Sequence, residues 1–375
     1  MWKVQLFKLN YDEAEPKAVE EVVRSGWITM GEKTKEFEGR FAEFLGNDAK
    51  VAAVSNGTAA LHLALLALGI GDGDEVIIPS LTFVADINTV LLVGAKPVLA
   101  DCRSLTDWNM DPADIERKIT PNTKAVMIVH YAGFPCDMDA IADICKRHNL
   151  RLIEDCAHAP GARYKGKPVG TFGDIGCFSF FTNKNLSMGE GGAVTTTSAE
   201  MDQEMRYVRA HGMTALTLDR HKGRAISYDV MRPGLNYRID EMRAAIGLAQ
   251  LDKLPEAHRC RKHIVERYID AFKDIDGLII PFVNQADTEP VYHIFPTMLP
   301  EGMDRMQVIE ILKREGVQSS IHYPMMQDFS ASKDYKLDET PLARSISTRE
   351  LTLPLYPTMT DEEVDIVIAA FRLAL

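Results

Sequence analysis

The sequence predicts an α/β protein: a doubly wound, seven-stranded sheet sandwiched by helices, followed by a smaller carboxyl-terminal α+β domain. Two observations over residues 50–200 indicate the sheet. Short apolar runs alternate with helical patterns and start roughly every 22–28 residues, which is the length of a βα unit. Most of these runs are continuously apolar, as in strands that are covered on both faces. After residue 240 the alternation stops, which indicates a different and smaller unit.

Seven segments have the length and composition of buried strands. They are residues 51–54, 75–79, 97–101, 125–130, 151–155, 176–180 and 192–196. Residues 57–69 (GTAALHLALLALG) are apolar nearly all round, which predicts a buried helix that ends at Gly69. Residues 137–149 (DMDAIADICKRHN) predict a further helix between two strands.

The last third of the chain follows another pattern. Residues 240–272 predict a long helix, broken near Pro255. Beyond it, VYHIFPTML and RMQVIEILKREGV mix strand and helix signals. We therefore expect a large α/β domain over residues 1–250 and a small α+β domain over residues 251–375.

Composition and charge argue against several classes of function. The chain has 375 residues, of which 46% are hydrophobic and 26% charged, and its formal net charge is −12. This acidity argues against non-specific binding to nucleic acid or to anionic membranes as the main role. No apolar run approaches the ~18 residues of a membrane span, and the amino terminus lacks an apolar signal core. The six cysteines are dispersed without a CxxC or histidine–cysteine motif, so we expect no metal site and a reducing cytoplasm.

Several polar residues follow the predicted strands, at the edge where such sheets bind ligands. Gly57 and Thr58 begin a helix directly after a strand, where they form either a plain helix cap or a phosphate cradle. Asp155 ends a strand, as a helix cap or as the partner of a cation. Ser179 and Lys184 lie in or near a glycine-rich turn between two buried strands. A lysine in a turn is usually a solvated charge, but both flanks of this turn are predicted to be buried.

Together these residues supply what pyridoxal 5′-phosphate requires. The cofactor needs a lysine that holds it as a Schiff base, and a carboxylate that keeps its ring nitrogen protonated. It also needs a phosphate anchor at a helix amino terminus. Lys184, Asp155 and the Gly57–Thr58 turn match these needs, and lost hydration would lower the pKa of the lysine so that its amine can attack. The large domain would then be the one that binds the cofactor.

At this point the sequence resembles a known family, the DegT/DnrJ/EryC1/StrS sugar aminotransferases of the fold-type I pyridoxal phosphate enzymes. The resemblance covers nearly the whole chain. It runs from SGWITMGEKTKEFE through NGTAALHLAL, GDEVIIPSLTFVAD and VHYAGFPCDMDAI to GLNYRIDEMRAAIGLAQL and LTLPLYPTMTDEEV. It also includes IEDCAHAPGARYKGKPVGTFGDIGCFSFFTNKNLSMGEGG, and the block from Asp155 to Gly192 is highly specific.

The resemblance implies roles for the residues that face the cofactor ring. Lys184 would be the Schiff-base lysine, Asp155 the partner of the pyridine nitrogen, and Phe83 the aromatic residue that stacks on the ring. His158 would face the 3-hydroxyl group, where many members have glutamine. The lysine motif FFTNKN also departs from the commoner FHxxKN, a difference that bears on the substrate pocket more than on the chemistry.

The resemblance further implies a phosphate site and an assembly. Gly57, Thr58 and Ser179 would bind the phosphate, and Asn236 of the NYR motif would reach it from the neighbouring subunit. The implied fold has a seven-stranded, mostly parallel sheet and a smaller carboxyl-terminal domain. The implied assembly is a homodimer whose active sites are shared between the two chains.

Within this family the sequence favours transamination. Dehydratases of the family carry histidine in place of the lysine, whereas this chain has Lys184. The expected reaction takes an amino group from L-glutamate, leaves 2-oxoglutarate and passes through pyridoxamine 5′-phosphate. The acceptor would be a keto or aldehyde sugar, most commonly a nucleotide-linked one, in amino-sugar biosynthesis for a surface polysaccharide or a natural product.

Several alternatives stay open. The acceptor could be a keto-cyclitol or an oxidised octulosonate-type sugar acid. An aminotransferase for ordinary amino acids would need an arginine for a second carboxylate, and none can be identified. A non-catalytic regulator on the same fold would be expected to lack Lys184 or Asp155.

Substrate contacts are less specific. We expect Trp27, Thr29, His322 and Tyr323 to contact the substrate, and His293 is a further candidate. Five basic residues form either a rim for a diphosphate or ordinary solvated charges. They are Arg206, Arg209, His211, Arg232 and Arg238.

Overall fold

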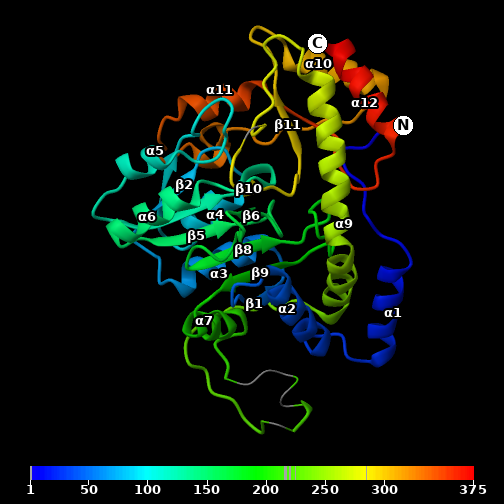
Figure 1. The fold of residues 1–375 in the computed structure, drawn as a ribbon. Coiled ribbons are helices and arrows are strands. Elements are labelled where there is room, and N and C mark those ends of the chain that lie inside the picture. The colour runs from blue at the N-terminus through cyan, green and yellow to red at the C-terminus, as the bar shows by residue number, and fades with distance from the viewer. Residues whose placement is uncertain (1, 215–217, 219–220, 224, 284) are drawn as a thin grey trace.

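A central sheet of seven strands dominates the computed structural model, which describes residues 2–214, 218, 221–223, 225–283 and 285–375 (Figure 1). The strand order is β1-β9-β8-β5-β4-β2-β3. These strands are β1 (Lys50–Val54), β2 (Glu75–Pro79), β3 (Lys96–Ala100), β4 (Thr123–Val129), β5 (Arg151–Asp155), β8 (Ile175–Ser179) and β9 (Gly192–Thr196). Neighbouring strands run parallel except that β9 is antiparallel to both β1 and β8. The prediction of a seven-stranded, mostly parallel sheet is confirmed.

The other described elements flank this sheet or follow it. The helices are α1 (Ala14–Ser25), α2 (Glu32–Leu45), α3 (Gly57–Ala67), α4 (Ala85–Leu92), α5 (Pro112–Arg117), α6 (Met138–His148), α7 (Ala199–Arg209), α9 (Glu241–Phe272), α10 (Arg305–Glu315), α11 (Pro341–Arg349) and α12 (Asp361–Ala374). The short strands are β6 (Arg163–Tyr164), β7 (Lys167–Pro168), β10 (Thr288–Glu289), β11 (Phe295–Met298) and β12 (Glu350–Leu353). None of the helices in the described part of the chain combines the length and apolarity that crossing a bilayer requires.

Continuous apolar strands arise because helices cover both faces of the sheet. In β2, Val76 and Ile78 pack into the core beneath α3, α4 and α7, whereas Ile77 packs into the opposite core beneath α5 and α6. The helix α3 is apolar nearly all round because it lies fully within the first core. The predicted helices at residues 57–69 and 137–149 are therefore present, with ends shifted by one or two residues.

Helix α9 runs without a break from Glu241 to Phe272, so the predicted interruption near Pro255 is wrong. Proline removes one backbone hydrogen bond, but packing holds both halves of the helix in line. Leu251, Leu254 and Ala257 are buried on either side of the proline. The helix packs against α1 and α2 near the sheet and against α12 in the carboxyl-terminal part (Figure 1).

The carboxyl-terminal part has its own core. Strands β11 and β12 pair antiparallel, and α10 and α12 pack together. Side chains of α9, α10 and α12 surround the two strands, and Val4 from the amino-terminal segment joins them. The expected boundary after residue 250 falls inside α9, and the division into two domains stays a prediction.

Candidate active site

A cavity of about 620 Å³ lies at the carboxyl ends of β1, β2, β4, β5 and β8. It has the size of a small-molecule site. Nine of the predicted site residues line it. They are Gly57, Thr58, Phe83, Asp155, His158, Ser179, Lys184, His322 and Tyr323. The register of the sheet explains part of this grouping, because Gly192 at the start of β9 lies opposite both Val54 and Ser179.

Four predicted residues lie outside this cavity lining. His293 is buried, and its ring lies 4.3 Å from that of His158. Asn236 is exposed and pairs through its backbone with Ala210, although the next residue, Tyr237, does line the cavity. Trp27 is half-buried, and Thr29 is exposed. Their predicted contacts with cofactor or substrate are therefore not made by the cavity wall of a single chain.

Two members of the expected basic rim have another partner. Arg206 and Arg209 donate to the buried carboxylate of Glu38 at 2.8 and 2.6 Å. Arg209 is only 2% exposed. These two guanidinium groups join α7 to α2, so they do not form a free surface for a diphosphate.

One end of the cavity is an anion site at the amino terminus of α3. The Asn56 side chain caps this helix by accepting the N–H of Ala59 at 2.8 Å. The N–H groups of Gly57 and Thr58 belong to the first turn and have no partner within the helix. A Cβ on Gly57 would lie 2.7 Å from Ser179 Cβ, so only glycine lets the Ser179 hydroxyl lie against the helix terminus. This cradle fits a phosphate group.

Lys184 extends from the turn between β8 and β9. The turn is anchored by apolar side chains, because Phe180, Leu186 and Met188 are buried in the core beneath α2 and α9. The backbone N–H of Lys184 donates to the carbonyl of Phe181 at 2.9 Å. Lost hydration lowers the pKa of Lys184 to about 8, although the charge of Asp155 opposes this shift. A substantial fraction of the amine is therefore neutral near pH 8 and can act as a nucleophile.

Asp155 ends β5 and is 7% exposed. Its Oδ1 accepts the N–H of Ala157 at 2.8 Å. Burial raises the pKa of this carboxyl group, and the Ala157 N–H and Lys184 oppose the rise by favouring the ionised form. A second buried carboxyl group, that of Asp86, lies beside it.

His158 is held in one tautomer. Its Nδ1 accepts the N–H of Ala132 at 3.2 Å, and burial lowers its pKa well below the ordinary value. The neutral ring must then carry its proton on Nε2, which lies 3.0 Å from the hydroxyl of Tyr323. Tyr323 accepts that proton, which leaves its own O–H free to donate elsewhere. The tyrosine ring also lies 5.8 Å from the ring of Phe83 across the cavity wall.

Two other features of the described chain do not offer a comparable site. His130, Glu154 and Cys156 cluster in the core, but Glu154 already accepts the N–H groups of Gly170, Phe172 and Gly173 and lies 3.1 Å from His130 Nε2. This carboxylate thus fixes the loop that follows β7.

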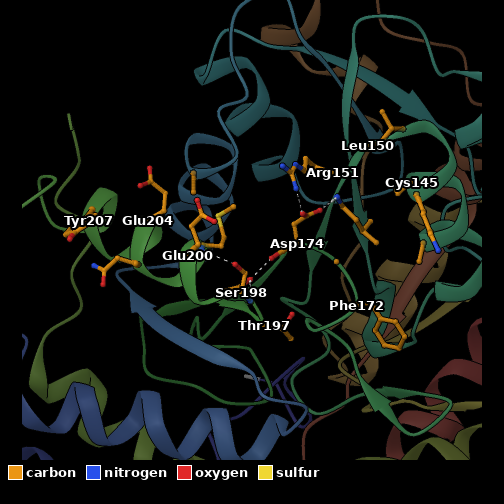
Figure 2. A pocket seen from close by; sticks show the side chains of 18 residues that line it. Cys145, Leu150, Arg151, Phe172, Asp174, Thr197, Ser198, Glu200, Glu204 and Tyr207 are labelled. Atoms are coloured by element: carbon orange, nitrogen blue, oxygen red, sulfur yellow. Dashed lines mark hydrogen bonds and ion pairs between the residues drawn. The ribbon is translucent and has the colours of Figure 1, made fainter. Parts of the chain in front are cut away.

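A larger cavity, of about 910 Å³, lies at the opposite edge of the sheet, where β5 begins (Figure 2). Arg151 donates to Asp174 there at 2.8 Å, and the same carboxylate accepts the N–H of Leu152 at 2.9 Å. Arg151 and Asp174 thus satisfy each other, and the cavity lies away from the carboxyl ends of the parallel strands.

Residues 10–372 match the model of the DegT/DnrJ/EryC1/StrS aminotransferase family. The chain belongs to this family. The spore coat polysaccharide biosynthesis protein SpsC of Bacillus subtilis is 40% identical over 366 residues, which are 96% of this chain and 93% of the relative.

Solved structures of family members have the same fold. The aminotransferase TlmJ of Streptoalloteichus hindustanus superimposes with a TM-score of 0.91 at 33% identity, over 100% of this chain and 98% of that one. The putative sugar aminotransferase Spr1654 of Streptococcus pneumoniae is 32% identical in its PLP form, with a TM-score of 0.90 over 97% of this chain and 96% of that one. The same protein was also solved in its PMP form.

Asp86 and Tyr237 are site residues that the sequence did not reveal. Tyr237 follows Asn236 in the NYR motif, so the motif could have indicated that Tyr237 also lies at the site. Asp86 follows Phe83 by three residues in the first turn of α4, where an aspartate is typical of an exposed helix terminus.

Proposed function

We propose that this protein is a pyridoxal phosphate-dependent aminotransferase that moves an amino group from L-glutamate to a keto sugar. The observation that carries the proposal is the grouping of Lys184 and Asp155 in one cavity whose far end is the phosphate cradle of α3 and Ser179. The PLP and PMP forms of Spr1654 support the choice of cofactor.

The bound cofactor supplies a carbonyl carbon that takes up an amino group and a ring that withdraws electrons from the neighbouring carbon. The residues of this chain perform the rest. The N–H groups at the start of α3 and the Ser179 hydroxyl hold the phosphate. Asp155 would hold a negative charge near the ring nitrogen. Lys184 Nζ would take the proton that leaves the amino-bearing carbon of the donor and would, in the second half of the reaction, give a proton to the sugar carbon that receives the amino group.

Lys184 is suited to this proton transfer because its pKa of about 8 lies close to neutral pH. His158 and Tyr323 fix the adjoining wall, with the Tyr323 hydroxyl available as a donor to an oxygen of the cofactor or substrate. The six cysteines are free thiols, which supports the expected cytoplasmic location.

We further propose that the acceptor is a nucleotide-linked keto sugar. The name of SpsC places that relative in polysaccharide biosynthesis, and the Helicobacter pylori relative PseC, 27% identical, is described as an aminotransferase in the biosynthesis of pseudoaminic acid. Both names connect relatives of this chain with carbohydrate biosynthesis, which supports a sugar as the acceptor here.

A panel of acceptors tests this proposal. The protein is loaded with pyridoxamine 5′-phosphate and mixed separately with a nucleotide-linked 4-keto hexose, a nucleotide-linked 3-keto hexose, a keto-cyclitol and an oxidised octulosonate. Absorbance follows the cofactor, and mass spectrometry follows the aminated product. We expect amination of a nucleotide-linked keto hexose. If only a non-nucleotide acceptor is aminated, the proposal of a nucleotide-linked acceptor is wrong. If no sugar is aminated, the proposal of a sugar aminotransferase is contradicted.

We also propose a homodimer in which Asn236 reaches the phosphate site of the partner subunit. Asn236 is exposed, and the segment ahead of it carries exposed apolar side chains at Ile226, Val230 and Met231. The described parts of this segment extend away from the sheet (Figure 1). An apolar segment that extends from the body of a subunit is suited to contact a second chain.

Subunit mixing tests this assembly. Lys184→Ala and Asn236→Asp chains, each impaired alone, should form mixed dimers in which one site carries both changes and the other carries neither. Half of the dimers are mixed and each has one intact site of two, so we expect about a quarter of the wild-type activity. If subunit exchange is demonstrated and no activity returns, Asn236 serves its own chain.

A further inference from the structure

Asp86 is a buried carboxyl group that the reaction outlined above does not use. It lies in the first turn of α4, three residues after Phe83, and its side chain is fully buried. Its Oδ2 accepts a hydrogen bond from the hydroxyl of Thr82 at 2.5 Å. Its Oδ1 is buried and accepts no N–H or O–H group of the described residues. An orphaned carboxylate oxygen in the core is costly, so this atom needs another explanation.

The group that faces Asp86 is the carboxyl group of Asp155, within hydrogen-bonding reach. Two adjacent carboxylates that are shielded from water cannot both ionise, so the pair holds one proton. Asp155 already accepts the N–H of Ala157 and lies near the cation of Lys184. Asp86 accepts only a hydroxyl, so the negative charge is better placed on Asp155 and the proton on Asp86.

The other groups around the pair do not change this distribution. Lys184 and His130 act on Asp155 and favour its ionised form. Cys177 and Tyr323 also face the pair. Burial raises the pKa of both, and the negative charge of the pair adds to the rise. Burial and the charge of Asp155 raise the pKa of Asp86 well above the ordinary value, which agrees with the assignment from geometry.

We propose that Asp86 is a positioning residue that stays protonated and donates a hydrogen bond from its carboxyl group to Asp155. This hydrogen bond favours the ionised form of Asp155 and fixes the direction of its carboxylate. A less basic Asp155 leaves the proton on the ring nitrogen opposite, which is the state that withdraws electrons best. Only this last consequence rests on the proposed function, since the proton shared by the pair is a property of the protein without cofactor.

Two substitutions separate a neutral donor from a charged group. Asp86→Asn keeps an acceptor for Thr82 and a donor for Asp155, so it imitates the protonated acid. Asp86→Val has a similar size and lacks both. We expect the asparagine variant to keep cofactor affinity and kcat within about threefold of wild type. We expect the cofactor affinity and kcat of the valine variant to fall roughly tenfold or more, which is the usual cost of losing a hydrogen bond to a charged group.

Infrared spectroscopy of the protein without cofactor gives a readout that does not depend on activity. At neutral pH the wild type should show the carbonyl absorption of buried protonated carboxylic acids. Asp86→Asn should lose the part that Asp86 contributes, whereas the part from Glu350, whose pKa burial raises to about 8, should stay. Asp139→Asn, which changes an exposed first-turn aspartate of α6, shows whether loss of any such residue removes part of this absorption. In addition, Asp86→Asn should gain thermal stability relative to wild type as pH rises, because wild type must hold a proton that its unfolded chain releases.

Clear outcomes contradict the proposal. If Asp86→Asn has the same carbonyl absorption as wild type, or if it impairs cofactor binding as much as Asp86→Val, Asp86 acts as an ion and the assignment is wrong. If Asp86→Val does not fold, the infrared comparison of wild type with Asp86→Asn still decides. If the absorption behaves as expected while the wild type fails to bind pyridoxal phosphate, the carboxyl pair stands and the proposed function fails.

Discussion

Replacing Lys184 with methionine should change how the stability of the cofactor-free protein depends on pH. Methionine keeps most of the length of the side chain and removes its charge. In the folded protein, burial lowers the pKa of Lys184 from its ordinary 10.5 to about 8. Between these values the unfolded chain binds more protons than the folded protein, so the stability of wild type rises with pH across this window. At about 1.4 kcal/mol per pH unit, the rise attributable to Lys184 is roughly 3 kcal/mol.

Urea unfolding of both proteins between about pH 7 and about pH 10.5 measures this effect. The free energy of unfolding of the variant minus that of wild type should be largest below about pH 8 and should fall by roughly 3 kcal/mol across the window. Lys124→Met, at an exposed lysine of β4, shows whether loss of any lysine gives the same pH dependence. A difference for Lys184→Met that stays constant with pH would refute the reasoning, because Lys184 would then bind its proton equally well in both states.

Three further substitutions test the geometry of the site. Asp155→Asn should leave the fold intact and lower kcat/KM by about 10²-fold or more, because a neutral amide cannot stabilise a protonated ring nitrogen. Activity within about threefold of wild type would show that Asp155 only caps the turn that follows β5. Gly57→Ala should weaken pyridoxal phosphate binding at least about tenfold, because the new Cβ would lie 2.7 Å from Ser179 Cβ. Gly39→Ala is the matched control, because its new Cβ meets nothing within 4 Å. Equal affinities of the two variants in a titration would contradict the assignment of a phosphate cradle at Gly57 and Ser179. Tyr323→Phe should lower kcat by roughly tenfold, because the variant loses the hydroxyl that accepts from His158 and can donate to the cofactor or substrate. An unchanged kcat would show that this hydroxyl is not used.

Much of the fold is predictable because burial on both faces of a parallel sheet leaves a simple pattern in the sequence. The seven predicted segments, most of them continuously apolar, correspond to the seven strands of the sheet, and the mostly apolar residues 57–69 contain the buried helix α3. The break expected at Pro255 is the counter-example. Local preference disfavours proline within a helix, but the buried residues Leu254 and Ala257 continue the packing surface across it. Such tertiary packing leaves no local signal that a single sequence could display.

The site was predictable where its residues directly follow strands. Gly57, Asp155 and Ser179 lie at strand ends, and the parallel arrangement brings those ends to one edge. Asp86 was not predictable, because an aspartate in the first turn of a helix usually faces water. Its inward direction depends on how α4 packs against the sheet, which only the structure shows.

The position of Asn236 shows a second limit. Asn236 lies in the loop ahead of α9. A residue that contributes to the site of a neighbouring subunit does not line the cavity of its own chain. The roles of Asn236, Trp27 and Thr29 therefore stay predictions that depend on the assembly.

The central claim is that Lys184 is the residue that holds the cofactor covalently. Borohydride reduction of the protein loaded with pyridoxal phosphate, followed by protease digestion and mass spectrometry, tests it most directly. Reduction converts the carbon–nitrogen double bond into a stable single bond, so the cofactor stays on the peptide of the lysine that held it. We predict that the modified peptide contains Lys184 and that the label is lost in Lys184→Ala. A label on any other lysine, or no label in a protein that binds the cofactor, would contradict the claim.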